Sequence, residues 1–82
     1  MITEIRKRDG RVEPFDASKI ANAITKAMVS VDEVDGDVAL RVTSKISNSN
    51  LSGVVDVEQI QDMVEDGLMG SRCKKTAKAY IK

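Results

Sequence analysis

Histidine is absent from this chain of 82 residues, and cysteine occurs once, at position 73. Without histidine the chain lacks the commonest general base and metal ligand of proteins. A single thiol forms no disulfide framework and is too little for a zinc site. We therefore expect no catalytic residue and no metal ligand here, and we expect Cys73 to pack as a small apolar side chain.

Aromatic residues are almost as scarce, since Phe15 and Tyr80 are the only ones. This excludes a row of stacking platforms for single-stranded nucleic acid. Proline occurs once and glycine five times, while 41% of the residues are hydrophobic. This composition is typical of a folded domain rather than a disordered segment, and the length allows one domain with a modest core.

No long apolar run and no excess of one charge is present, because 13 basic residues balance 13 acidic ones. The chain therefore lacks the composition of a membrane span and of a general nucleic-acid binder. We expect a cytoplasmic location, with neither membrane nor nucleic acid as a partner. The balance hides a local bias, because Arg6, Lys7, Arg8 and Arg11 crowd the first eleven residues.

Two short segments, residues 3–8 and 11–15, flank the pair Asp9-Gly10. An Asp-Gly pair in this setting predicts a tight hairpin, because both central positions accept a positive φ. Pro14 has no N–H to give to a ladder, so the second strand should be short or lie at an edge.

Beyond the hairpin, apolar residues recur at helical spacing in four stretches. The recurrence predicts four amphipathic helices, the first over residues 17–28, with Asp16, Asp56 and Ser71 as caps of the first, third and fourth. The side chains expected to be buried are Ile20, Ala23, Ile24 and Ala27 in the first helix, Val38, Val42 and Ile46 in the second, Val57, Ile60, Val64 and Leu68 in the third, Cys73, Ala77, Tyr80 and Ile81 in the fourth, and the methionines Met28, Met63 and Met69.

The connecting segments complete the predicted fold. The acidic residues 32–37 and the polar residues 47–53 read as solvated loops. Val54-Val55 predict a short third strand, and Gly67 and Gly70 should mark the end of the third helix. The expected class is α+β: a small N-terminal hairpin or three-stranded sheet covering a four-helix bundle, in one domain over residues 1–82. Because the helical pattern runs to the last residue, we expect an N-terminal fragment of a larger protein.

The most specific pattern is the order of unlike residues in IRKRDGRVEPFDASKIANAITKA, residues 5–27. This run resembles the ATP-cone, and residues 55–69 and 77–82 are similar to the later helices of that family. ATP-cones are regulatory modules of ribonucleotide reductases, and they also occur in a zinc-ribbon repressor of reductase genes. The resemblance implies a domain that binds ATP or dATP as an allosteric effector, with or without Mg²⁺.

The residues themselves suit a nucleotide. Side chains alternate along a strand, so Ile5 and Lys7 should share a face that offers an apolar contact and an ammonium. Lys19 lies in the first turn of the first helix, where free N–H groups and the positive dipole end favour phosphate. Glu13 can accept a hydrogen bond from a ribose hydroxyl or a base amine. With the contact positions that the resemblance implies, the predicted nucleotide site is Ile5, Lys7, Arg8, Glu13, Pro14, Phe15, Asp16, Ala17, Ser18, Lys19, Ile20 and Val57. In the family pattern a further basic contact falls just past Lys82.

Each signal also has a plainer interpretation. A run of cations is usually a solvated surface, and it is the combination with Glu13 and Lys19 that favours nucleotide binding. Asp16 is more typical of a helix cap than of a ligand group, and Phe15 of a core residue than of a stacking platform. Neither the P-loop nor the dinucleotide glycine motif occurs.

The expected parent protein is an anaerobic, glycyl-radical ribonucleoside-triphosphate reductase, because KRDGRVEPFD, residues 7–16, closely resembles the N-termini of those enzymes. Aerobic and cobalamin-dependent reductases stay open. In the repressor a zinc ribbon precedes the cone, whereas Met1 here lies at its start, so this alternative ranks lower. A degenerate cone that serves packing or dimerisation is a third hypothesis, and self-association through the cone is compatible with all of them. A radical reductase needs several thiols, so we expect this domain alone to be non-catalytic.

Overall fold

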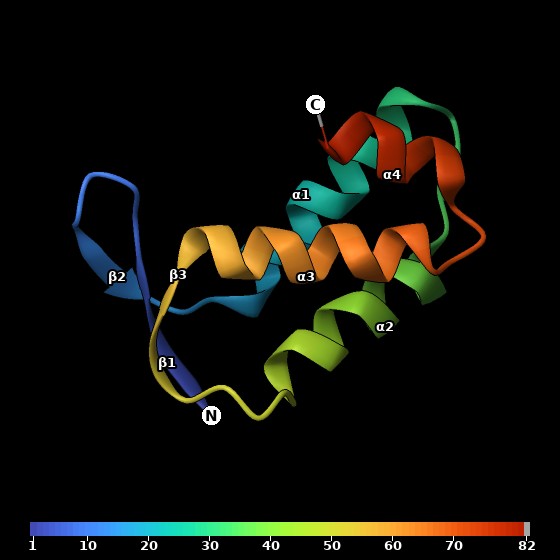
Figure 1. Cartoon of the computed structure of the whole chain (residues 1–82). Helices are drawn as coiled ribbons and strands as arrows, with labels where there is room; N and C mark the ends of the chain where they lie inside the picture. The colour runs from blue at the N-terminus through green and yellow to red at the C-terminus, as the bar shows by residue number, and fades with distance from the viewer. Residues whose placement is uncertain (82) are drawn as a thin grey trace.

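The computed structural model describes residues 1–81. A three-stranded sheet lies at one end of four helices (Figure 1), which confirms the predicted α+β class. In chain order the elements are β1 (Ile2–Arg6), β2 (Val12–Pro14), α1 (Ala17–Ser30), α2 (Gly36–Ser47), β3 (Gly53–Asp56), α3 (Val57–Met69) and α4 (Lys74–Ile81).

The sheet has the strand order β2-β1-β3, with β2 antiparallel and β3 parallel to β1. Pro14 ends β2 at the edge of the sheet, as predicted, and the third strand expected at Val54-Val55 is present. The parallel register sets Arg6 opposite Asp56, so the end of β1 lies beside the start of α3. The sheet thereby brings the basic hairpin next to a helix that begins fifty residues later.

The hairpin turn differs from the predicted two-residue type. The Lys7 amide donates to the Arg11 carbonyl at 2.7 Å, and the Gly10 amide donates to the Lys7 carbonyl at 2.9 Å. Residues 8–10 thus form a three-residue loop in which Gly10, with φ of 90°, is the left-handed position. Lys7 and Arg8 consequently follow β1 instead of lying within it as the sequence suggested.

The four helices form a closed ring of contacts, in which α1 packs on α2 and α4, and α3 packs on the same two helices. Figure 1 shows α3 crossing in front, with α2 below it and α4 above. The predicted stripe of α2 is buried throughout, and the other three helices bury part of theirs, leaving Ala27, Val57 and Tyr80 only half-buried. The fully buried side chains at the centre are Ile24, Met28, Ile46, Val64, Leu68, Cys73 and Thr76.

Several predicted core positions are wrong. Ala23 is exposed because the buried line of α1 runs through Ile20, Ile24 and Met28, spaced by four residues. Met69 and Ile81, 49% and 44% exposed, stand at helix ends, where neighbouring helices cover only part of a side chain.

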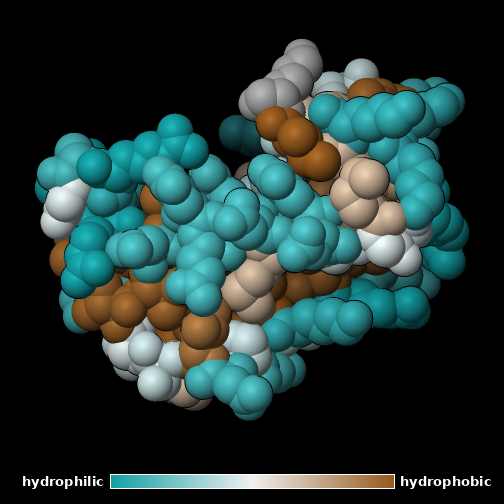
Figure 2. All heavy atoms as spheres, in the orientation of Figure 1, coloured by the Kyte–Doolittle hydropathy of each residue, from teal (hydrophilic) through white to brown (hydrophobic). Residues whose placement is uncertain are grey.

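Gly67 does not mark the end of a helix, because α3 continues to Met69 and Gly70 occupies its C-cap. A Cβ atom at Gly67 would lie 3.0 Å from Cγ1 of Val42, so this glycine lets α2 and α3 approach closely. Beside it runs an open groove of about 410 Å³ whose lining includes Ile46 and Met63. Figure 2 shows a narrow strip of apolar atoms between the hydrophilic side chains of α3 and those of α2.

The acidic loop is also more than a solvated connection. The Asp35 carboxylate caps α2 by accepting from the Val38 amide at 3.2 Å, and it pairs with Arg72 at 2.7 Å. Glu33 accepts hydrogen bonds from Thr76 at the start of α4. The segment therefore ties the α1–α2 connection to α4, a contact without any local sign in the sequence.

Two of the three predicted caps differ in detail. Asp16 caps α1 as expected. Asp56 precedes α3 but makes no side-chain cap, because its carboxylate pairs with Arg6 instead. The Ser71 hydroxyl accepts from the Cys73 amide at 3.0 Å, and α4 begins only at Lys74. Within residues 1–81, none of the helices has the length and apolar character needed to cross a bilayer.

Candidate functional site

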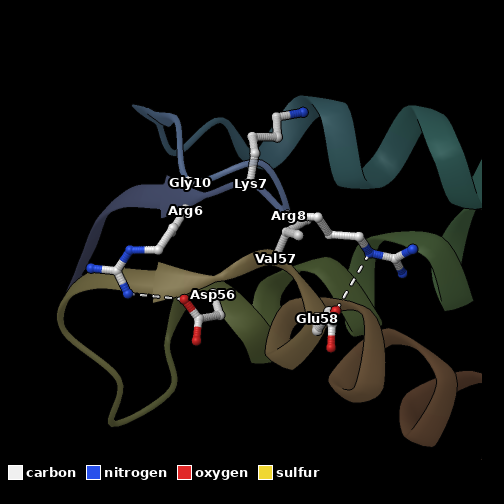
Figure 3. Close-up of a pocket in the computed structure, with 7 residues that line it drawn as sticks. All are labelled: Arg6, Lys7, Arg8, Gly10, Asp56, Val57 and Glu58. Carbon is white, nitrogen blue, oxygen red and sulfur yellow. Dashed lines mark hydrogen bonds and ion pairs between the residues drawn. The ribbon is translucent and has the colours of Figure 1, made fainter.

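An open cleft of about 280 Å³ lies between the hairpin and the start of α3 (Figure 3). Its lining residues are Arg6, Lys7, Arg8, Gly10, Asp56, Val57 and Glu58. A second cleft of about 350 Å³ adjoins it and shares Lys7, Arg8 and Val57 with it. The remaining residues of the second cleft are Asp9, Arg11 and Gln61. Together the two clefts carry the four cations of the hairpin, Arg6, Lys7, Arg8 and Arg11, and the half-buried Val57 belongs to both linings.

Lys7, Arg8 and Val57 were all predicted from the sequence, and the fold brings these three together. The β1–β3 pairing is the cause, because it places the residues that follow β1 beside the first turn of α3. The same pairing adds Arg6, Asp56 and Glu58, which were not among the residues predicted for the site. A parallel pairing between segments fifty residues apart has no local signature, so no pattern in the chain pointed to them.

The arginines of the cleft are paired with carboxylates of α3 or of the residue before it. Arg6 Nη1 lies 3.0 Å from Asp56 Oδ1, and Arg8 Nε lies 3.5 Å from Glu58 Oε1. Arg8 also donates through Nη2 to the Gln61 side chain at 3.1 Å. In Figure 3 both guanidinium groups extend from the hairpin toward the β3–α3 side. The cations are therefore in place, but carboxylates already neutralise them.

Lys7 points the other way, toward α1 (Figure 3). Its ammonium lies 3.8 Å from the Glu13 carboxylate, across the antiparallel pair of strands. The two sides of the hairpin thus carry different groups, with Arg6 and Arg8 facing α3, and Lys7 with Glu13 facing α1. A ligand with several phosphates that lies across the hairpin tip can contact both sides.

The start of α1 differs from the expectation that free amides await a phosphate. The Asp16 carboxylate accepts from the amide and hydroxyl of Ser18 at 3.0 and 2.6 Å, and the Asp16 carbonyl accepts from the Lys19 amide at 3.1 Å. The hydrogen bonds from Ser18 lower the pKa of Asp16 below its usual range, so this carboxylate stays charged. What the helix start still offers is the Lys19 ammonium, which is exposed and makes no ion pair with any residue of 1–81.

The other predicted contacts line neither cleft. Ile5 lies half-buried between its partners Glu13 and Val55 in the sheet. Phe15 packs against the core as the plainer interpretation predicted, and Ile20 is itself buried. Pro14 ends β2, Asp16 precedes α1, and Ala17 and Ser18 begin that helix. The contacts of all these residues with a nucleotide stay predictions.

No group of three or more acidic or cysteine side chains converges as a metal site within residues 1–81. A divalent ion at this site would need ligands from a bound phosphate chain as well as from Asp56 or Glu58. The arrangement is suited to holding a polyanion, because it combines cations on two sides with an open hollow.

Comparison with known proteins agrees with the resemblance seen in the sequence. The family model described as "ATP cone domain" matches residues 3–82. An anaerobic ribonucleoside-triphosphate reductase of Haemophilus influenzae is 38% identical over 78 residues, which cover 92% of this chain and 11% of the relative. A vitamin B12-dependent ribonucleoside-diphosphate reductase of Thermoplasma acidophilum is 43% identical over 90 residues, covering 99% of this chain and 11% of the relative. The chain thus spans about a ninth of the length of the relatives it matches.

Proposed function

Because this chain belongs to the ATP-cone family, we propose that it binds ATP or dATP as an allosteric effector and regulates a ribonucleotide reductase. The observation that carries the proposal is that the basic turn after β1 lies between the start of α3 and α1. Lys7 and Arg8 lie in the turn between β1 and β2, and the exposed Lys19 lies in the first turn of α1, the helix toward which Lys7 points (Figure 3). A triphosphate needs several such cations, since charge-assisted contacts to phosphate supply much of its affinity.

The base and sugar would lie on the α1 side of the hairpin. Ile5 and Phe15 offer partly exposed apolar surface there, and Glu13 offers a carboxylate acceptor. Glu13 also pairs with Lys7, so a bound nucleotide would either share this carboxylate with Lys7 or replace Lys7 as its partner. Because Glu13 can accept from the amine of adenine, we include selectivity for adenine over guanine in the proposal. Comparing the affinities of ATP and GTP tests this selectivity.

Calorimetric titration with ATP, dATP and GTP tests the proposal, with size-exclusion chromatography run on the same samples. We expect adenine nucleotides to bind more tightly than GTP, and one of them to change the size of the particle. Lys7→Ala and Lys19→Ala should each weaken ATP binding about tenfold or more, the worth of a charge-assisted hydrogen bond.

Lys26→Ala is the matched control for Lys19→Ala. Lys26 is exposed on the same helix and lies two turns further from the hairpin, about 10 Å along the axis. Its loss changes the net charge equally and should leave ATP affinity within twofold. An equal loss of ATP affinity in Lys26→Ala and Lys19→Ala would show that the effect comes from net charge alone. A folded protein that binds no nucleotide would overturn the proposal.

We further propose that the parent protein is the anaerobic type of reductase, on the strength of the KRDGRVEPFD run. Relatives of both the anaerobic triphosphate and the B12-dependent diphosphate kind match this chain. The test is the substrate of the parent protein. Reduction of ribonucleoside triphosphates without added cobalamin supports the proposal, and cobalamin-dependent reduction of diphosphates contradicts it.

A further inference from the structure

The hairpin contains four cations, and each of them is paired with a carboxylate. The pairs are Arg6–Asp56 at 3.0 Å, Lys7–Glu13 at 3.8 Å, Arg8–Glu58 at 3.5 Å and Arg11–Asp9 at 2.7 Å. Two of these carboxylates, Asp56 and Glu58, come from the β3–α3 junction and line the same cleft as the arginines they neutralise. A phosphate chain that enters this cleft therefore meets arginines that already have an anionic partner.

We propose that Asp56 and Glu58 act as built-in competitors of the phosphate chain for Arg6 and Arg8, and so set the affinity of this cleft for polyphosphates. The inference rests on the proposed function, because it concerns how the same site selects its ligand. The ligand class is a linear polyphosphate, free or as part of a nucleotide.

The exposure of these pairs makes them displaceable. The Arg6 and Asp56 side chains are 52% and 62% exposed, and those of Arg8 and Glu58 are both 69% exposed. Ion pairs as exposed as these contribute little, because water screens them and two long side chains must be ordered. A polyphosphate carries several charges linked covalently in one chain, so it outcompetes separate carboxylates where a single carboxylate ligand would not.

The two carboxylates also repel an incoming phosphate directly, since both line the cleft. Lys19 makes no ion pair with any part of the described chain, and its exposed ammonium adds an attraction for the phosphate chain from the start of α1. Binding is then an exchange in which phosphate oxygens replace Asp56 and Glu58 on the two guanidinium groups. Removing either carboxylate's charge should lower the cost of this exchange.

The test uses Asp56→Asn and Glu58→Gln, separately and combined, titrated with sodium tripolyphosphate and with ATP at low ionic strength. Each single variant should bind tripolyphosphate about three- to tenfold more tightly than the unmodified chain, and the double variant should gain more than either. Circular dichroism establishes that each variant is folded. Either single variant decides the matter alone if the other fails to fold.

Asp32→Asn is the matched control, because it removes the same unit of charge from the α1–α2 turn. Asp32 is exposed there with φ of 54°, a conformation that asparagine also accepts. It should change tripolyphosphate affinity by less than twofold. A gain in Asp32→Asn equal to that in Asp56→Asn would overturn the proposal in favour of net charge alone.

Unchanged or weaker tripolyphosphate binding in Asp56→Asn and Glu58→Gln would also overturn it, since the carboxylates would then be neutral or helpful to binding. The proposed function fails separately, when the unmodified chain binds no ATP. Even then the tripolyphosphate comparison between the unmodified chain and its variants decides whether the carboxylates compete for the arginines.

Discussion

The carboxylate of Glu33 accepts two hydrogen bonds from Thr76, 43 residues later in the chain. The Thr76 amide donates at 2.8 Å and its hydroxyl at 2.7 Å, both to Oε1. Glu33 thereby caps the first turn of α4 from the α1–α2 connection. Thr76 is fully buried, so this contact fixes the α1–α2 connection to the start of α4 beside the core.

Thr76→Val should destabilise the fold while keeping its shape. Valine fills the same volume and keeps the amide that donates to Glu33, but it has no hydroxyl donor, and the loss of a hydrogen bond to a charged group is costly. We expect the melting temperature to fall by several degrees. Thr25→Val is the control, because Thr25 is exposed and its hydroxyl bonds only the Ala21 carbonyl within α1. Equal melting temperatures for Thr76→Val and the unmodified chain would show that the hydroxyl's hydrogen bond to Glu33 adds nothing to stability.

Acid should weaken the same contact. The Thr76 hydroxyl, followed by the Thr76 amide, lowers the pKa of Glu33 below its ordinary value of 4.5. A carboxylate with a lowered folded pKa stabilises the fold at pH above 4.5, and this contribution is lost as the pH falls through the folded pKa. Urea unfolding at about pH 6 and about pH 3 should therefore show a smaller acid loss in Glu33→Gln than in the unmodified chain.

Asp35 adds to this acid sensitivity in the same direction. Its hydrogen bond from Arg72 is the main cause that lowers the pKa of Asp35 below 3.8. Its contribution is present above that value and disappears at still lower pH. Asp35→Asn combined with Glu33→Gln should lose still less stability on acidification than Glu33→Gln alone. If all variants lost the same stability between the two pH values, neither carboxylate would contribute to the acid sensitivity.

Gly67→Ala should push α2 and α3 apart. The new Cβ atom would lie 3.0 Å from Cγ1 and 3.1 Å from Cγ2 of Val42. Overpacking of this kind costs about 1–3 kcal/mol in the free energy of unfolding, and the better helix propensity of alanine returns up to about 1 kcal/mol. Chemical denaturation should thus report a net loss.

Gly36→Ala is the control for this substitution. Gly36 is the first residue of α2, and a Cβ atom there would meet nothing within 4 Å. The variant should be neutral or gain up to about 1 kcal/mol through the unfolded chain. If Gly67→Ala matched Gly36→Ala, the close approach of the two helices would not depend on the glycine.

Cys73 should react slowly with thiol reagents. It is 1% exposed, and burial raises the pKa of its thiol, which lowers the thiolate fraction. Modification by a disulfide reagent should become fast only in urea concentrations that unfold the chain. Ser52→Cys combined with Cys73→Ser places a thiol on an exposed loop and should react at once. Fast labelling of native Cys73 would contradict its burial.

Periodicity predicted the helices and most of their buried faces correctly. Ile24, Val42 and Val64 lie in the core because spacing of three and four residues on a helix leaves few alternatives. The hairpin followed from Asp9-Gly10, although the turn used three residues because only Gly10 adopts a positive φ. The positions that failed, such as Ala23 and Met69, lie at the margins of a stripe or at a helix end, where burial depends on the neighbouring element.

The site could be predicted only in part. Lys7 and Arg8 stood out through a local run of unlike residues, and Lys19 through its place in a first helical turn. Asp56 and Glu58 did not, because their relation to Arg6 and Arg8 exists only once β3 pairs with β1.

The sequence by itself determined the class of fold, the four helices, the hairpin and the family to which the chain is similar, since all of these depend on local order and spacing. Only the tertiary structure decided which charges meet. It joined Arg6 to Asp56, Arg8 to Glu58 and Arg72 to Asp35 across long separations in the chain. Such pairs carry no periodic signal, because a charged side chain at the surface satisfies its own helix or strand equally well whether or not a partner lies opposite it.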